Sequence, residues 1–120
     1  MANAPTAGKH VVRYFMTGLD EQLARDLASA LERQGCRGVA SARVADVVFG
    51  PAKNDILEGL IRRVGRRPVI AVSGIAETNH WLDALEAGAA DYCVAPFEGI
   101  HLRWLLDRHC GPPRAAAAVA

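Results

Sequence analysis

Few side chains in this chain have both the type and the spacing that chemistry requires. Its three cysteines, Cys36, Cys93 and Cys110, lie far apart and lack the paired spacing of a zinc site or a redox dithiol. An odd number of such thiols favours reduced cysteines in the cytoplasm over a disulfide framework. We expect Cys93 to pack in a core strand and Cys36 to be reactive only if it is exposed. The four histidines show no metal-ligand spacing either, so we expect surface positions and no metal for all of them: His10, His80, His101 and His109.

Isolated charged residues follow two segments that contain glycine or proline. Asp20 comes after a Gly-Leu pair, and Lys53 and Asp55 come after a Gly-Pro-Ala segment. A lone carboxylate at the start of a helix is more often a cap than a ligand, so we expect Asp20 or, alternatively, Thr17 to cap one helix. We expect Asn54 to cap the next helix, Asp55 to complement the dipole of that helix, and Lys53 to be solvated.

Alternating strands and helices must position these residues. Short apolar runs predict strands at 10–16, 36–40, 45–49, 68–72 and 91–94, of which the second is weak. Apolar residues at helical spacing predict helices at 19–34, 54–64, 77–87 and 98–109. Strands that are apolar on both faces form a parallel sheet covered on two sides, and right-handed crossovers make the fold doubly wound. The functional crevice of such a sheet lies at the carboxyl ends of its strands.

Length and composition predict one α/β domain. We place it at 9–110, between a flexible N-terminus at 1–8 and a flexible C-terminal tail at 111–120. Apolar residues make up 51% of the chain and its net charge is +1, which excludes a disordered chain and a broad surface for nucleic acid or membranes. No apolar run reaches the roughly 18 residues that cross a bilayer, and residues 1–8 do not read as a signal peptide, so we expect a cytoplasmic protein. One cluster of arginines, interpreted as a solvated helix end, comprises Arg62, Arg63, Arg66 and Arg67.

Residues 68–98, PVIAVSGIAETNHWLDALEAGAADYCVAPFE, resemble the fourth strand to the start of the fifth helix of a response-regulator receiver (CheY-like) domain. The resemblance rests on Ser73 after an apolar strand, on ALEAGA before Tyr92, and on Pro96-Phe97 after the fifth strand. LASALERQG at 27–35 is similar to the end of the first helix of a receiver. The resemblance covers about 9–110 and implies a flavodoxin-like, five-stranded parallel sheet in the order 2-1-3-4-5.

Receivers hold Mg²⁺ with a carboxylate pair after the first strand, and an Asp after the third strand accepts the phosphoryl group. A hydroxyl after the fourth strand and a Lys after the fifth bind the phosphoryl oxygens. In this chain the carboxylate pair falls at Gly18 and Leu19, the acceptor at Pro51 or, in the other register, Gly50, and the Lys at Ala95. Only the hydroxyl at Ser73 and the aromatic switch position at Tyr92 match the family. The resemblance therefore implies a pseudo-receiver that is neither phosphorylated nor an enzyme and that needs no cofactor.

The chain is short between the second and third strands. Gly35 and Asp46 leave too few residues for a strand and a helix of ordinary length, so we expect the second helix to be missing or reduced to a turn. In an alternative register, 45–49 is the second strand and the helix beginning at Asn54 is the second helix.

A pseudo-receiver acts by binding, so we expect a signalling protein or a second copy of the chain as the partner. Receivers commonly bind through the fourth helix, fifth strand and fifth helix. Helical spacing turns Leu82 and Leu85 toward the core and Trp81 and Trp104 outward on this face. Two alternatives stay open: a phosphoryl-accepting receiver that uses Asp55 or Asp20, and a small-ligand or redox-responsive domain on the same fold.

Overall fold

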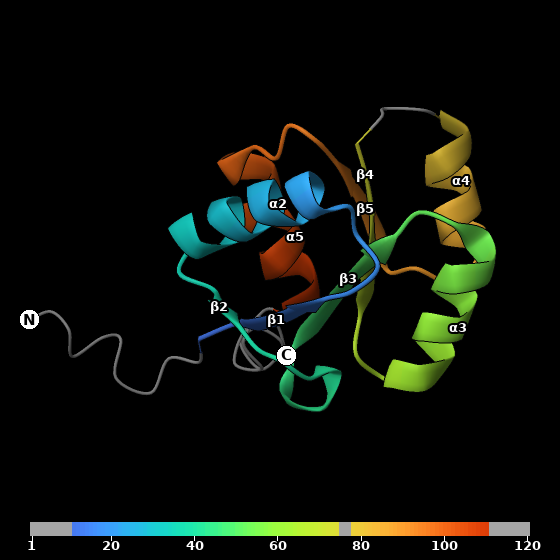
Figure 1. Cartoon of the computed structure of the whole chain (residues 1–120), viewed down its shortest axis with the longest axis horizontal. Coiled ribbons are helices and arrows are strands. Elements are labelled where there is room, and N and C mark those ends of the chain that lie inside the picture. Colours follow the sequence, from blue (N-terminus) through green and yellow to red (C-terminus); the bar gives the residue numbers. More distant parts are fainter. Residues whose placement is uncertain (1–10, 75–77, 111–120) are drawn as a thin grey trace, which may run out of the picture.

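A computed structural model describes residues 11–74 and 78–110 of the chain, and the expected flexible ends at 1–8 and 111–120 lie outside the described residues. Five parallel strands form one sheet in the order β2-β1-β3-β4-β5 (Figure 1). The expected flavodoxin-like fold and strand order are therefore confirmed. The elements in chain order are β1 Arg13–Met16, α2 Glu21–Arg33, β2 Arg37–Gly38, the 3₁₀ turn η1 Ala42–Val44, β3 Val47–Pro51, α3 Asn54–Val64, β4 Val69–Ser73, α4 Thr78–Glu86, β5 Asp91–Val94 and α5 Gly99–Cys110.

Helices cover both faces of the sheet (Figure 1). Helices α2 and α5 lie against one face, and α3 and α4 lie against the other. Alternate residues of the central strands therefore enter two separate cores. Phe49 and Ile70 pack with α2 and α5, whereas Val48 and Val69 pack with α3. Because β3 and β4 are buried on both faces, their near-continuous apolar sequences are explained.

The helix that usually connects the second and third strands of a receiver is reduced to the turn η1, as the short spacing between Gly35 and Asp46 predicts. Arg67, which follows α3, holds this turn in place. Its Nε donates to the carbonyl of Ala45 at 3.1 Å, one terminal nitrogen donates to the carbonyl of Val64 at 3.1 Å, and the other donates to the carbonyl of Arg43. One guanidinium thus ties the end of α3 to the turn that replaces a helix. The alternative register is wrong, because 47–51 pairs with both β1 and β4 and is the third strand.

The two helix starts differ from each other. Asp20 caps α2 as expected, since its Oδ2 accepts from the backbone N–H of Leu23 at 3.0 Å. The expectation that Asn54 caps α3 is wrong: Lys53 occupies the cap position and makes no side-chain cap hydrogen bond. The reason lies in the backbone, because the Lys53 carbonyl accepts from Leu57 N–H at 2.8 Å and so places Asn54 inside the first turn.

Helix packing follows the sequence in α5 but not in α4. Leu102 and Leu106 of α5 are buried as expected. The expected burial of Leu82 and Leu85 in α4 is wrong, since these side chains are 45% and 39% exposed. Among residues 81–86 of α4 the buried one is Ala84, whose small side chain lies against the core shared with α3. Across residues 11–74 and 78–110, no helix combines the length and apolarity that crossing a bilayer requires.

Candidate functional site at the carboxyl ends of the strands

The carboxyl ends of β1, β3, β4 and β5 meet at one edge of the sheet because all four strands are parallel. The loop after β1 is fixed to this edge by a hydrogen bond from Thr17 N–H to the Phe49 carbonyl, 3.1 Å long. The segment after β5 is fixed by a hydrogen bond from Ala95 N–H to the Ser73 carbonyl, 3.0 Å long. The structure therefore brings four of the expected site segments together: the ends of β1, β3 and β4 and the first residue after β5.

Gly18 and Pro51 are in contact at the centre of this edge. An ideal Cβ built on Gly18 would lie 3.1 Å from Cδ and 3.2 Å from Cγ of the Pro51 ring. Gly18 also has a φ of +75°, a conformation that side-chain-bearing residues rarely adopt. A carboxylate at position 18 would thus meet both backbone strain and the proline ring. The space beside the end of β3 is occupied by an apolar ring, which offers no ligand to a cation.

Gly50 faces the opposite side of the sheet. A Cβ on Gly50 would come within 2.5 Å of Leu60 Cδ2, so α3 packs directly on its backbone. A side chain at 50 would point into the core under α3, whereas residue 51 lies beside the loop after β1. Of the two candidate acceptor positions, only Pro51 lies at the edge where the strands end.

Apolar side chains lie just before and within the first turn of α2. Leu19 and Leu23 are partly buried and pack against the core shared by α2 and α5. A Cβ on Gly74 would lie 3.7 Å from Leu23 Cδ1, so Leu23 reaches from α2 to the residue after β4. Ser73, the last residue of β4, is buried.

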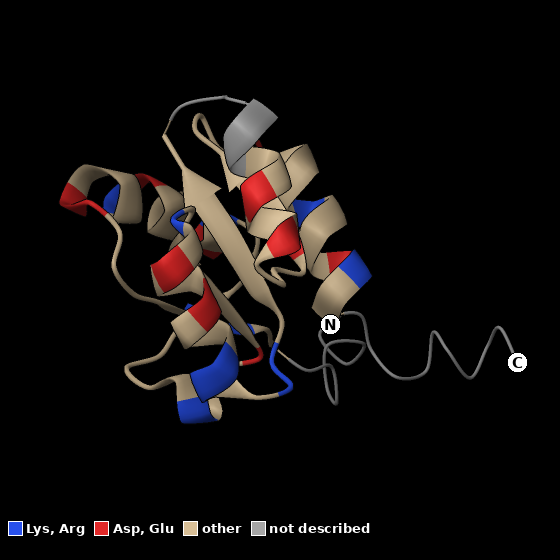
Figure 2. Ribbon diagram, turned by 90° about the vertical axis from the view of Figure 1, so that its right-hand side faces the viewer, with Lys and Arg blue, Asp and Glu red and all other residues tan. Residues whose placement is uncertain are grey.

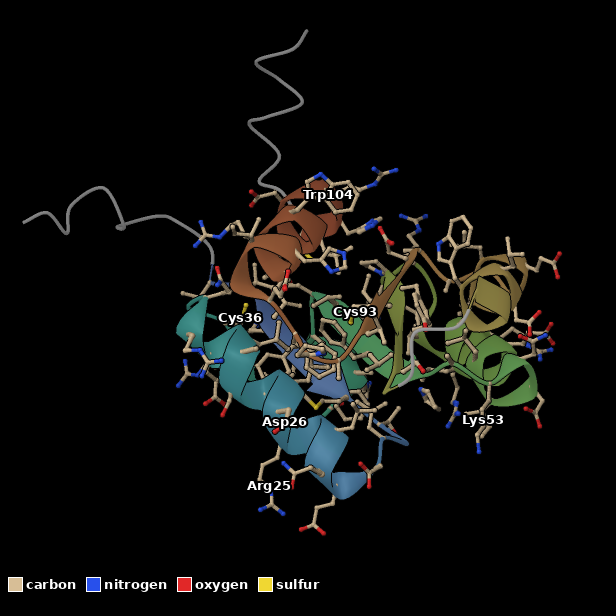
Figure 3. The ribbon with its side chains drawn as sticks, turned by 90° about the horizontal axis from the view of Figure 1, so that it is seen from above. Arg25, Asp26, Cys36, Lys53, Cys93 and Trp104 are labelled. Atoms are coloured by element: carbon tan, nitrogen blue, oxygen red, sulfur yellow. The ribbon has the colours of Figure 1, made fainter. Side chains whose placement is uncertain are left out.

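The acidic and basic residues near this edge are engaged elsewhere or point outward. Asp20 is exposed and caps α2. Asp55 is exposed in the first turn of α3, and Lys53 projects outward at the start of that helix (Figure 3). Within the described parts of the chain, no three His, Cys, Asp or Glu side chains are grouped so that they could hold a metal ion.

The three thiols are buried or half-buried and are kept in the neutral form. Burial raises the pKa of Cys93 to about 12, with a smaller contribution from Asp91. Burial, and then the nearby Asp46 and Cys36, raise the pKa of Cys110 to about 12. Burial also raises the pKa of Cys36, although Arg103 opposes the shift. Since the thiolate is the reactive form, these shifts disfavour nucleophilic or redox chemistry at neutral pH.

Two polar interactions in the structure were not predicted from the sequence. The Tyr14 hydroxyl donates to Glu32 Oε2 at 2.9 Å, and burial together with this bond raises the Tyr14 pKa to about 12. His109 was expected at the surface, but it is mostly buried at the end of α5, with Nε2 3.0 Å from Asp91 Oδ2 at the start of β5. No local motif marks either pair, because the partners are 18 positions apart and meet only in the fold.

Both tryptophans are exposed, and they lie on the two helices that flank the edge strand β5 (Figure 1). Trp81 on α4 is 45% exposed, and Trp104 on α5, labelled in Figure 3, is 49% exposed. Trp104 is bracketed by its own helix: Arg108 lies 5.0 Å from the ring centroid, and His101 stacks at 6.3 Å. Leu82 and Leu85 add further exposed apolar surface to α4.

Comparison with known proteins agrees with this architecture. No protein-family model and no curated protein matches the sequence. Among solved structures, a response regulator from Thermotoga maritima matches with a TM-score of 0.70 and 15% identity, covering 86% of this chain and 100% of that one. The chain has the receiver fold. The receiver domain of a sensor histidine kinase from Pseudomonas aeruginosa, which has a magnesium ion coordinated in its active-site cleft, matches with a TM-score of 0.69 and 17% identity, covering 86% and 100%.

The receiver fold also occurs in a protein assigned to pilus assembly from Burkholderia thailandensis. That chain matches with a TM-score of 0.69 and 20% identity, covering 85% of this chain and 100% of that one. At these identities the likeness establishes the fold, and the chemistry has to be argued from the residues of this chain.

Proposed function

We propose that this chain is a pseudo-receiver: a cytoplasmic, non-enzymatic module that binds a partner in two-component-type signalling and is not phosphorylated. The contact between Gly18 and Pro51 carries the proposal. These residues stand where a working receiver needs a metal-binding carboxylate and the phosphoryl acceptor. Neither position has an oxygen ligand or a nucleophile.

Phosphoryl transfer on this fold depends on neutralising charge, and this chain lacks the groups for it. Mg²⁺ requires near-octahedral oxygen ligands, and a proline ring beside a glycine provides none. The position of the phosphate-binding Lys is Ala95. Because metal and Lys stabilise the same charged transition state, the loss of both leaves the retained Ser73 with no phosphoryl group to bind.

The alternative acceptors are poorly placed for this chemistry. Asp20 Oδ2 already accepts the cap hydrogen bond of α2, and Asp55 lies on the exposed side of α3. The redox alternative is weakened by burial, since the raised pKa of Cys36 and Cys93 keeps both thiols protonated. No observation favours either alternative over the pseudo-receiver.

We assign partner binding to the face formed by α4, β5 and α5, with a signalling protein or a second copy as the occupant. Trp81 and Trp104 are its candidate anchors, because half-exposed tryptophans on a partly apolar surface are typical of interaction hot spots. Arg108 and His101 contact the Trp104 ring and restrict its motion before a partner binds. The loss of side-chain conformational entropy on binding is therefore smaller.

Incubation with Mg²⁺ and acetyl phosphate, followed by intact-protein mass spectrometry, tests the proposal. A receiver with a complete site serves as the positive control. We expect no phosphorylated species of this chain, and we expect no stable complex with beryllofluoride. Stoichiometric phosphorylation on Asp20 or Asp55 would overturn the proposal in favour of an unconventional receiver.

A further inference from the structure

The outer side of α3 carries opposite charges at its two ends. Asp55 and Glu58 lie on the first half of the helix and Arg62 on the second, and all three are exposed. At helical spacing they share the side opposite the buried residues Leu57, Leu60 and Val64. Figure 2, which looks onto α3 and α4, shows acidic residues toward the start of α3 and basic residues at its end. Arg63 and Arg66, also exposed, extend the basic end.

Within residues 11–74 and 78–110, none of these charged side chains forms an ion pair. Glu58 and Arg62 stand at the i,i+4 spacing that favours a helical ion pair, yet among the described residues neither makes an ion pair. By contrast, Glu21 and Arg25 on α2, at the same spacing, do pair at 2.8 Å. The helix dipole accounts for the signs of the charges on α3. The dipole does not explain why Glu58 and Arg62 form no ion pair with each other, and both side chains can therefore contact a second molecule.

Gly59 separates the acidic half of α3 from the basic half. Its φ is not positive, and an ideal Cβ built on it would meet nothing within 4 Å. The fold therefore does not require glycine here, although glycine inside a helix costs about 1 kcal/mol relative to alanine. The missing side chain lets another helix approach the backbone closely. Ile56, 46% exposed one turn earlier, supplies an apolar contact beside it.

We propose that two copies of this chain associate through α3, packed antiparallel about a two-fold axis near Gly59. This arrangement sets the Asp55 end of each helix opposite the Arg62 and Arg63 end of its partner. The same complementary contact then forms twice, as an isologous interface requires. Lys53 precedes the first turn and lies outside the overlap of the two helices. The interface uses no residue of the face formed by α4, β5 and α5, so it does not depend on the proposed function.

One helix pair buries less than the roughly 1,200 Å² of a stable interface, so the association should be weak. Exposed charges supply its specificity, and salt screens them. We expect dissociation on the order of 0.1 mM at low ionic strength, which sedimentation equilibrium can measure, and at least fivefold weaker association in 0.5 M salt.

Charge reversal and mixing provide the decisive test. The acid-reversed variant carries Asp55→Arg and Glu58→Arg, and the base-reversed variant carries Arg62→Glu and Arg63→Glu. Each variant alone should be monomeric, because like charges then meet across the axis, and an equal mixture should form a heterodimer. A matched control, Arg25→Glu with Asp26→Arg on α2 (Figure 3), should associate like the wild type. Circular dichroism verifies the fold of each variant.

A second variant keeps the test independent of folding defects. Gly59→Gln should raise thermal stability, since glutamine is a good helix former, while weakening association at least tenfold because its side chain blocks close approach. Monomeric wild-type protein at about 1 mM and low salt, or failure of the two reversed variants to associate on mixing, would overturn the α3 dimer. Dimerisation that survives both reversals but is lost in Trp81→Ala would also overturn it and would assign self-association to the other face.

Discussion

Replacing Arg67 tests whether its side chain stabilises the turn η1, which stands in place of a full helix between β2 and β3. The side chain is half-buried and donates to three backbone carbonyls, those of Arg43, Ala45 and Val64. A hydrogen bond from a charged donor contributes about 1.5–3 kcal/mol when it is buried, but water can replace part of these bonds. After that discount we expect Arg67→Ala to lower the free energy of unfolding by about 2 kcal/mol. Arg66→Ala, one position earlier and exposed, is the matched control.

Urea denaturation followed by circular dichroism measures the effect as a shift in midpoint at unchanged slope. We expect Arg66→Ala to change stability by less than about 0.5 kcal/mol, as surface substitutions usually do. Arg67→Lys should recover less than half of the loss, because an ammonium cannot span three carbonyls as a planar guanidinium does. Equal stabilities of the Arg67→Ala and Arg66→Ala variants would refute the claim that this side chain replaces the second helix.

Three further predictions concern chemistry, binding and pH. Pro51→Asp alone should not permit phosphorylation in Mg²⁺ and acetyl phosphate, as read by intact mass, because metal ligands and Lys are still absent. Trp81→Ala or Trp104→Ala should weaken partner binding by about 2 kcal/mol, roughly 30-fold, in calorimetry with folded variants. Tyr14→Phe should cost about 1 kcal/mol in urea denaturation. The difference between wild type and Tyr14→Phe should shrink as pH rises from 10.0 to about 12, because Tyr14 ionises first in the unfolded state.

The strands and the reduced second helix could be predicted because they follow from patterns that are local in sequence, whereas the strand order was implied by the resemblance to receivers. The apolar run of β4 and the short spacing between Gly35 and Asp46 each constrain one element without reference to the rest of the fold. The cap at Asp20 is equally local, since it involves a backbone N–H three residues away. Each of these features is determined by residues that lie close together in the sequence.

Predictions failed where contacts with another helix or strand determine how a side chain is placed. In α4, helical spacing predicted that Leu82 and Leu85 face the core, but Ala84 packs there with residues of α3. His109 and Tyr14 find partners on other elements, so a count of histidines or an apolar strand pattern could not predict either pair. For Gly50 and Pro51 the sequence leaves two registers open, because the packing of α3 on the backbone of Gly50 depends on a separate element.

The backbone conformation at Gly18, and not only the missing side chains, disfavours the phosphorylation chemistry of a receiver. Gly18 has a positive φ, and a Cβ on it would lie 3.1 Å from the Pro51 ring. An Asp placed at position 18 would be strained while Pro51 remains, and an Asp placed at position 51 would face a glycine that cannot bind metal. No single substitution therefore leads from this arrangement to a working phosphorylation site.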